Sequence, residues 1–91
     1  MAQRSQAHIA LGAAVRDLRA RRGISQEALA EISGMHRTYL GGIERGHRNP
    51  SFTNIRKLAD ALDVRTSELL LRAEELESGD EREVGTDPPR T

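Results

Sequence analysis

The chain contains no cysteine and no tryptophan, and it has a single tyrosine and a single phenylalanine. The absence of cysteine excludes a disulfide scaffold and a thiolate-ligated metal site, and it makes the cytosol the natural compartment. No stretch approaches the roughly 18 apolar residues of a membrane-spanning helix, so we expect no membrane partner. The N-terminal segment is weakly apolar and is soon interrupted by Arg16, so we expect no signal peptide.

Large apolar residues are also scarce. Of the 91 residues, 36% are hydrophobic, which predicts one small domain with a modest core and few walls for a substrate cavity. The three histidines, His8, His36 and His47, lack the spacing of metal ligands, and no serine, histidine and acid arrangement stands out. We therefore expect no enzyme, no metal and no cofactor.

The charges cancel over the whole chain but not along it. Fourteen basic and fourteen acidic residues sum to zero, yet residues 1–72 carry a net charge of +5 and residues 73–91 carry −5. Residues 78–91 are rich in charge and poor in apolar side chains, which predicts a disordered acidic tail. This tail is either a solubilising terminus or an autoinhibitory or partner-binding segment, and the sequence leaves both open.

The rest of the chain shows helical periodicity and no alternation long enough for a strand. The fold class is therefore expected to be all-α: a compact five-helix bundle over residues 9–77, preceded by a flexible arm over residues 1–8. The first helix carries Leu11, Ala14, Val15 and Leu18 at helical spacing, and its pattern stops at Gly23. The second follows Ser25 and ends at Gly34, and the third is marked by Leu40 and Ile43 and closed by Gly46. The fourth is capped by Ser51 and places Phe52, Ile55, Leu58, Ala59 and Leu62 on one face, and the fifth runs from Thr66 through Leu76.

The second and third helices are short and are joined by a turn that contains Gly34. This arrangement is typical of the helix-turn-helix, whose second helix lies in the DNA major groove. Ala30 is small where the next helix crosses, Gly34 supplies a left-handed backbone, and Leu40 with Ile43 anchors the second helix of the motif. We expect the motif over residues 26–45.

The segment SQEALAEISGMHRTYLGGIERGHRNPS resembles the phage repressor and Cro class, also called the xenobiotic-response-element family. The resemblance spans about residues 9–72, and the part from Thr38 onward looks especially like small restriction–modification controller proteins and compact actinobacterial repressors. It implies a sequence-specific transcriptional regulator, a repressor or autoregulator of bacterial or phage type. Such a protein is cytoplasmic, and nucleoid-associated when bound.

The resemblance assigns base contacts to the first turn of the third helix, at His36, Arg37 and Thr38. Arg37 can present a bidentate fork to guanine, and Thr38 can bind a base edge or a thymine methyl group, each contact giving about 1–3 kcal/mol of discrimination. A solvated surface arginine is the alternative for Arg37. Gly41 and Gly42 provide no side chain for a further base pair, so contacts concentrate on residues 36–38 or the backbone comes unusually close to DNA.

Phosphate contacts are expected on either side of these residues. The resemblance assigns one to Gln26, where the helix dipole also attracts an anion; a plain exposed glutamine is the alternative. Tyr39 either packs on the second helix with its hydroxyl at a phosphate or is purely structural. The following loop would contact the DNA backbone as well, unless its arginines only reflect genomic composition, through Arg45, Arg48 and Asn49.

One acid, Glu44, lies beside the expected DNA face and would repel phosphate unless it is neutralised. In the family that this segment resembles, the glutamate that matches Glu44 pairs with an arginine of the first helix. The corresponding residue here is Arg19. We therefore expect a structural ion pair that locks the third helix to the first.

Family members normally bind palindromic double-stranded DNA as two-fold dimers over half-sites about one helical turn apart. Three consecutive leucines, residues 69–71, point around more than half of the fifth helix. The alternative is that the extra leucine caps the fourth helix within one chain. The residues expected to meet a second copy are Leu70, Leu71, Ala73 and Leu76. A different function class also fits: an antitoxin whose tail binds a toxin while its helix-turn-helix represses their operon.

Overall fold

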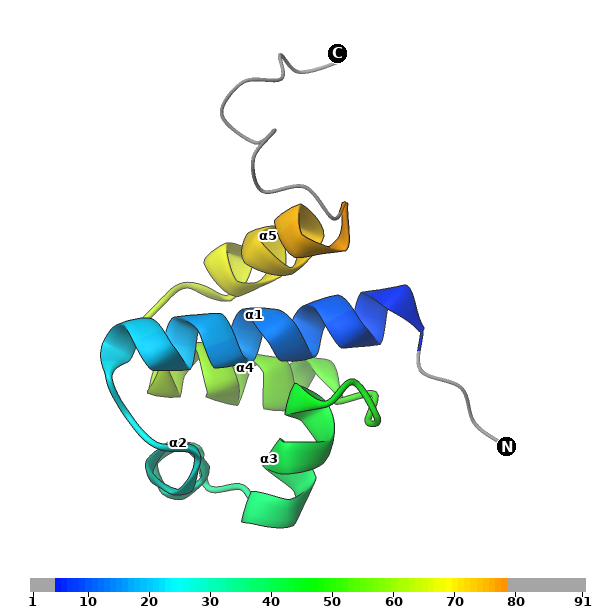
Figure 1. The fold of residues 1–91 in the computed structure, drawn as a ribbon. Coiled ribbons are helices and arrows are strands. Elements are labelled where there is room, and N and C mark those ends of the chain that lie inside the picture. Colours follow the sequence, from blue (N-terminus) through cyan, green and yellow to red (C-terminus); the bar gives the residue numbers. More distant parts are fainter. Residues whose placement is uncertain (1–4, 79–91) are drawn as a thin grey trace.

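The structure, a computed structural model, describes residues 5–78 as five helices packed around one core (Figure 1). They are α1 (Gln6–Arg22), α2 (Gln26–Ser33), α3 (Arg37–Glu44), α4 (Phe52–Ala61) and α5 (Thr66–Glu77). Residues 5–78 contain no strand, which confirms the all-α class with a helix-turn-helix formed by α2 and α3. Among the same residues, no helix combines the length and hydrophobicity of a membrane span.

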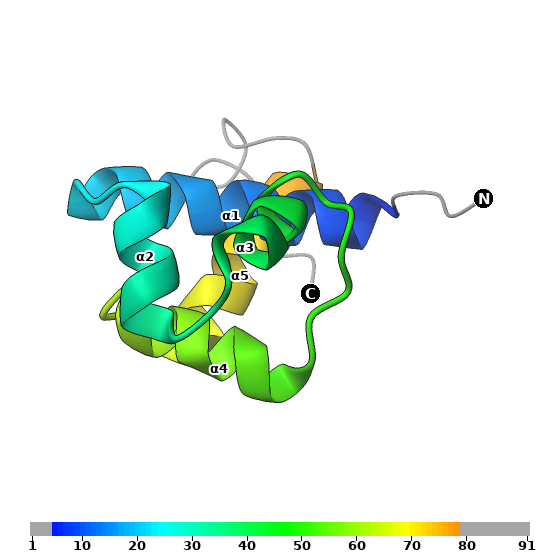
Figure 2. The same ribbon diagram turned by 90° about the horizontal axis from the view of Figure 1, so that it is seen from below.

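The longest helix, α1, packs against α5 on one side and α3 on the other (Figure 1), and α5 also packs against α4. Seen from below, α3 sits between α1 and α4, with α2 to one side (Figure 2). The large side chains with no more than 1% of their surface exposed are Val15, Leu29, Leu40, Ile43, Leu58 and Leu69. All five helices therefore share one core.

Short polar caps set the limits of the helices. Ser25 Oγ accepts a hydrogen bond from the Ala28 backbone N–H at 3.0 Å, and Ser51 Oγ accepts one from Asn54 at 3.1 Å. The first two helices end at glycines whose φ angles, 77° at Gly23 and 76° at Gly34, are left-handed. These are the capping residues that the sequence predicts for α1, α2 and α4, because each acts on backbone groups within a few residues.

The first helix begins earlier than its apolar pattern predicts. Ser5 Oγ accepts from the His8 N–H at 3.0 Å and caps a helix that starts at Gln6. Residues 6–8 therefore belong to α1 instead of the expected arm, because the cap satisfies the first turn without any apolar side chain. Residues 1–4 and 79–91 lie outside the described residues, and so does the expected tail apart from Ser78, which caps the end of α5.

Phe52 does not face the core, contrary to the expectation from its spacing. Its side chain is 62% exposed, whereas Leu58 further along α4 is fully buried. Phe52 is the first residue of α4, and helical side chains lean toward the N-terminus, so this ring projects past the end of the core.

Two of the residues expected at a dimer interface are taken up by the chain's own core. Ala73 is buried in it and Leu76 packs against it, because both follow Leu69 at helical spacing on one face of α5. Ala73 therefore has almost no surface left for a second copy, whereas Leu76 is only partly buried and stays a predicted interface residue. Leu70 and Leu71, at 37% and 55% exposure, remain on the surface, so neither leucine is absorbed as a cap of α4.

Candidate nucleic-acid interface

The turn between α2 and α3 presents the first turn of α3 to solvent. The Met35 N–H donates to the Ala30 carbonyl at 2.9 Å, which closes the turn after α2. Leu40 and Ile43 are buried beneath α3. His36, Arg37 and Thr38, which precede them, are all exposed on the same turn. The structure thus brings together the three residues expected to meet base edges.

His36 caps α3 with its own ring. Its Nδ1 accepts from the Thr38 backbone N–H at 3.1 Å, and His36 is the N-cap residue of the helix. A ring nitrogen that accepts a hydrogen bond carries no proton, so Nε2 carries it in this arrangement. His36 therefore combines a structural role with an exposed N–H donor.

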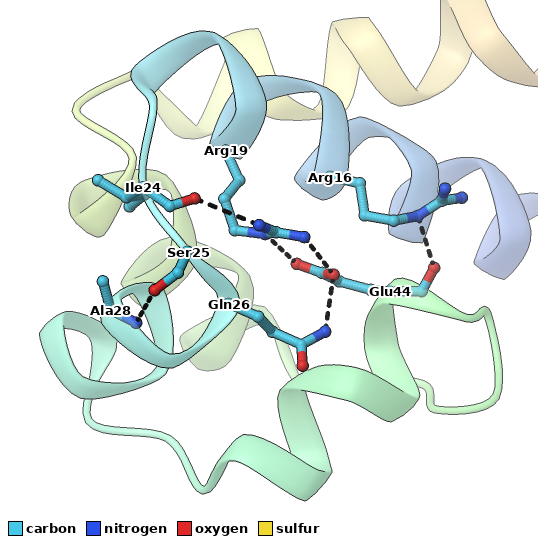
Figure 3. A network of polar contacts seen from close by, with 7 residues as sticks. All are labelled: Arg16, Arg19, Ile24, Ser25, Gln26, Ala28 and Glu44. Atoms are coloured by element: carbon cyan, nitrogen blue, oxygen red, sulfur yellow. Dashed lines mark hydrogen bonds and ion pairs between the residues drawn. The ribbon is translucent and has the colours of Figure 1, made fainter.

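Glu44 is the centre of a polar network that joins three helices (Figure 3). Its side chain is almost fully buried, and Arg19 binds it with two bonds, Nε to Oε2 at 2.8 Å and Nη2 to Oε1 at 3.1 Å. Gln26 Nε2 donates to the same Oε1 at 2.9 Å. The ion pair between Arg19 and Glu44 is thus present, and it ties α3 to α1 and to the start of α2.

The hydrogen bonds that Arg19 donates to Glu44 raise the pKa of Arg19 above its ordinary value, with burial opposing the effect and the carboxylate charge adding to it. A group whose pKa is raised by folding stabilises the fold fully at any pH below its ordinary value. Arg19 therefore keeps its charge, and its contribution to stability, throughout the physiological range.

The end of α3 is attached to α1 by two further features. Arg16 Nε donates to the Glu44 backbone carbonyl at 3.2 Å. A Cβ atom added to Gly12 would lie 2.3 Å from the Ile43 carbonyl oxygen and 2.6 Å from that of Glu44. The two helices thus approach to a distance that only glycine permits at position 12, a role that its place within a predicted helix did not indicate.

Gln26 is the residue of α2 expected to contact a phosphate, and its amide has a protein partner. Its Nε2 donates one proton to Glu44, which leaves the second amide proton for another acceptor. The side chain is half-buried at the first position of α2. It lines a shallow open pocket together with Arg37, Thr38, Gly41 and Arg45.

Gly42 makes room for a loop arginine. A Cβ atom at this position would lie 2.7 Å from Arg48 Cγ. The Arg48 guanidinium carbon is 6.0 Å from the centroid of the Tyr39 ring, a distance at which a cation and a ring attract each other. Arg48 thus occupies the space that a side chain at position 42 would need. The spacing of residues along the sequence did not indicate this contact.

Tyr39 is partly buried against the core, and its hydroxyl accepts from Asn54 Nδ2 on α4 at 3.2 Å. The hydroxyl proton remains available to a phosphate oxygen. Asn54 is therefore a supporting residue that sequence reasoning missed. The segment after α3 exposes three residues that are expected to contact the phosphates of the DNA backbone: Arg45, Arg48 and Asn49.

Comparison with known proteins places this site in a family. The helix-turn-helix family profile matches residues 15–69. The control protein C.SmaI of Serratia marcescens is 48% identical over 58 residues, covering 64% of this chain and 69% of that protein. The control protein C.BamHI of Bacillus amyloliquefaciens is 47% identical over 60 residues, covering 65% and 74%.

Solved structures agree with these relatives. The restriction–modification controller protein C.AhdI from Aeromonas hydrophila has a TM-score of 0.66 at 52% identity, covering 67% of this chain and 92% of that one. The clp gene regulator ClgR from Corynebacterium glutamicum has a TM-score of 0.79 at 29% identity, covering 87% and 84%. These relatives do not favour the antitoxin alternative. The chain belongs to the helix-turn-helix family and is a DNA-binding transcriptional regulator.

Proposed function

We propose that the protein binds a palindromic operator as a homodimer, with the first turn of α3 in the major groove, and so controls transcription in the cytoplasm. The observation that carries this proposal is the exposed turn of His36, Arg37 and Thr38 on a helix locked to α1 through buried Glu44. A recognition helix must hold its side chains in register while they meet base edges. The network around Glu44 supplies that rigidity.

The contacts divide into base-reading and phosphate-binding groups. Arg37 reads guanine through its paired N–H groups, Thr38 meets an adjacent base, and the exposed Nε2–H of His36 supplies a further donor. The phosphates are held by the free amide proton of Gln26, the hydroxyl of Tyr39 and the loop groups of Arg45, Arg48 and Asn49. The relatives that are named control proteins support a regulator that acts through such an operator.

The first prediction concerns base reading. Selection from random DNA with the wild-type protein should recover a palindrome whose half-sites lie about ten base pairs apart. Arg37→Ala should weaken binding to that site by at least about thirtyfold, because it removes one bidentate contact of about 1–3 kcal/mol from each half-site of the dimer. Its binding to unrelated DNA should change far less, because the contact is specific to one base. Fluorescence anisotropy on both DNAs measures the ratio.

Arg65→Ala is the matched control for this experiment. Arg65 is exposed at the N-cap of α5, the helix on the opposite side of α1 from α3 (Figure 1). Its removal changes the net charge by the same amount and touches none of the residues proposed to contact DNA. Because Arg65 belongs to the N-terminal capping box of α5, sedimentation equilibrium checks that this variant remains a dimer. No enriched sequence in the selection, or an equal loss from both variants, would contradict the proposal.

The second prediction concerns the dimer. Leu70 and Leu71 are neighbouring exposed apolar side chains on α5, and we propose that a second copy covers them. The double substitution Leu70→Asp with Leu71→Asp should give a monomer in sedimentation equilibrium and weaken operator binding more than about tenfold, because each half-site then binds alone. Circular dichroism checks that the helices remain.

Ile32→Asp serves as the control for charge placed on an exposed apolar residue. Ile32 is 53% exposed at the end of α2, away from the leucines of α5. This variant should remain a dimer. A folded double variant that sediments like the wild type would show that another surface forms the dimer.

A further inference from the structure

Arg37, the proposed guanine reader, has an acidic partner on the other helix of the motif. Its Nη1 donates to Glu27 Oε2 at 3.0 Å. The two side chains are 59% and 66% exposed, so solvent and salt reach the pair. Glu27 lies in the first turn of α2, where the helix dipole favours a negative charge. An acid at a DNA-binding face thus has a defined orientation and a defined partner.

The bond to Glu27 occupies only part of the guanidinium. An arginine side chain has five N–H donors, and a single donor from Nη1 is used here. The N–H groups of Nε and Nη2 remain and form an edge that can grip guanine O6 and N7. Glu27 can therefore stay bound while Arg37 meets a base, and it restricts the rotation of the long arginine side chain.

The pair also changes which partner Arg37 prefers. A lone guanidinium is attracted to any phosphate by its charge, whereas a guanidinium paired with a carboxylate 3.0 Å away is close to neutral as a unit. A phosphate that approaches Arg37 must also approach Glu27 and is repelled by it. A guanine edge carries no net charge and meets no such repulsion.

We propose that Glu27 is a positioning residue that determines specificity, by holding Arg37 for a base and making its use on phosphate unfavourable. This inference rests on the proposed function, in which Arg37 reads a base. It assigns to an acid on α2 a contribution to discrimination that needs no contact between Glu27 and DNA.

The test compares Glu27→Gln with the wild type on the selected operator and on an unrelated duplex, over a range of salt concentrations. Glutamine keeps the shape of the side chain and removes its charge. Affinity for the unrelated duplex should rise about fivefold at low salt, and its salt dependence should steepen by up to about 0.9 in log–log slope for each protomer, as for one additional phosphate contact per protomer. Affinity for the operator should change less, so the ratio of the two falls.

Glu31→Gln is the matched control. Glu31 is exposed on α2 one turn beyond Glu27 and makes no ion pair within residues 5–78. The substitution Glu31→Gln removes the same charge from the same helix as Glu27→Gln, so any general effect of charge on DNA affinity appears equally in both variants. The ratio of operator to unrelated affinity should stay unchanged in Glu31→Gln.

The double variant Arg37→Ala with Glu27→Gln separates positioning from simple repulsion. If Glu27 acts through Arg37, Glu27→Gln should not alter the affinity ratio in the Arg37→Ala background. An unchanged ratio in the single variant, or the same change in both backgrounds, overturns the inference. The proposed function fails on a different result: an Arg37→Ala protein that keeps full preference for the operator, whatever the two glutamates do.

Discussion

Glu44→Ala should lower the free energy of unfolding by about 3–5 kcal/mol, measured by urea denaturation, because it leaves a partly buried guanidinium without its carboxylate. Arg19 would lose both of its bonds to Glu44 and keep its bond to the Ile24 carbonyl, at 3.2 Å. Gln26 would lose its acceptor at the same time. A loss of this size is a large part of the total stability of a small domain.

The comparison for this result is the exposed ion pair of the same motif. Glu27→Ala removes a carboxylate from Arg37, but both side chains of that pair are largely in water. Exposed pairs contribute about 0–1 kcal/mol, so this variant should unfold close to the wild-type urea concentration. Equal stability of the two variants would mean that Glu44 does not lock α3 to α1.

Gly12→Ala should be comparably destabilising, although it adds a single methyl group. The new Cβ atom would lie 2.3 Å from the carbonyl oxygen of Ile43, and this neighbour is backbone rather than the end of a flexible side chain. Either α1 or α3 must therefore move. Overpacking of this kind costs about 1–3 kcal/mol and occasionally more, and the backbone neighbour places the expected loss near the upper value.

Gly41→Ala tests the same substitution where the space can adjust. The nearest atom to its added Cβ is Arg45 Nη1 at 3.1 Å, the end of a long side chain. Alanine is favoured over glycine within a helix by about 1 kcal/mol, so stability should stay level or rise slightly. A thermal melt of both variants checks the contrast, and a Gly12→Ala protein as stable as the wild type would contradict the close approach of α1 and α3.

The ends of several helices could be predicted from the sequence because the capping residues act locally. Serine at positions 25 and 51 and glycine at 23 and 34 act on backbone groups within a few residues, so their effect is readable along the chain. Phe52 shows where periodicity fails. Helical spacing identifies an apolar face, but it does not say where along the helix the core ends.

The sequence by itself determined the all-α class and the placement of the helix-turn-helix, because short-range bonds and apolar spacing specify these. The proposal that the first turn of α3 meets DNA comes from the resemblance to the family. The tertiary structure alone decided that Arg37 meets Glu27, ten residues away, and that Gln26 meets Glu44, eighteen residues away. It also decided that Arg48 lies where Gly42 has no side chain. Such contacts depend on how separate helices are packed together, and no local pattern of residue types records that packing.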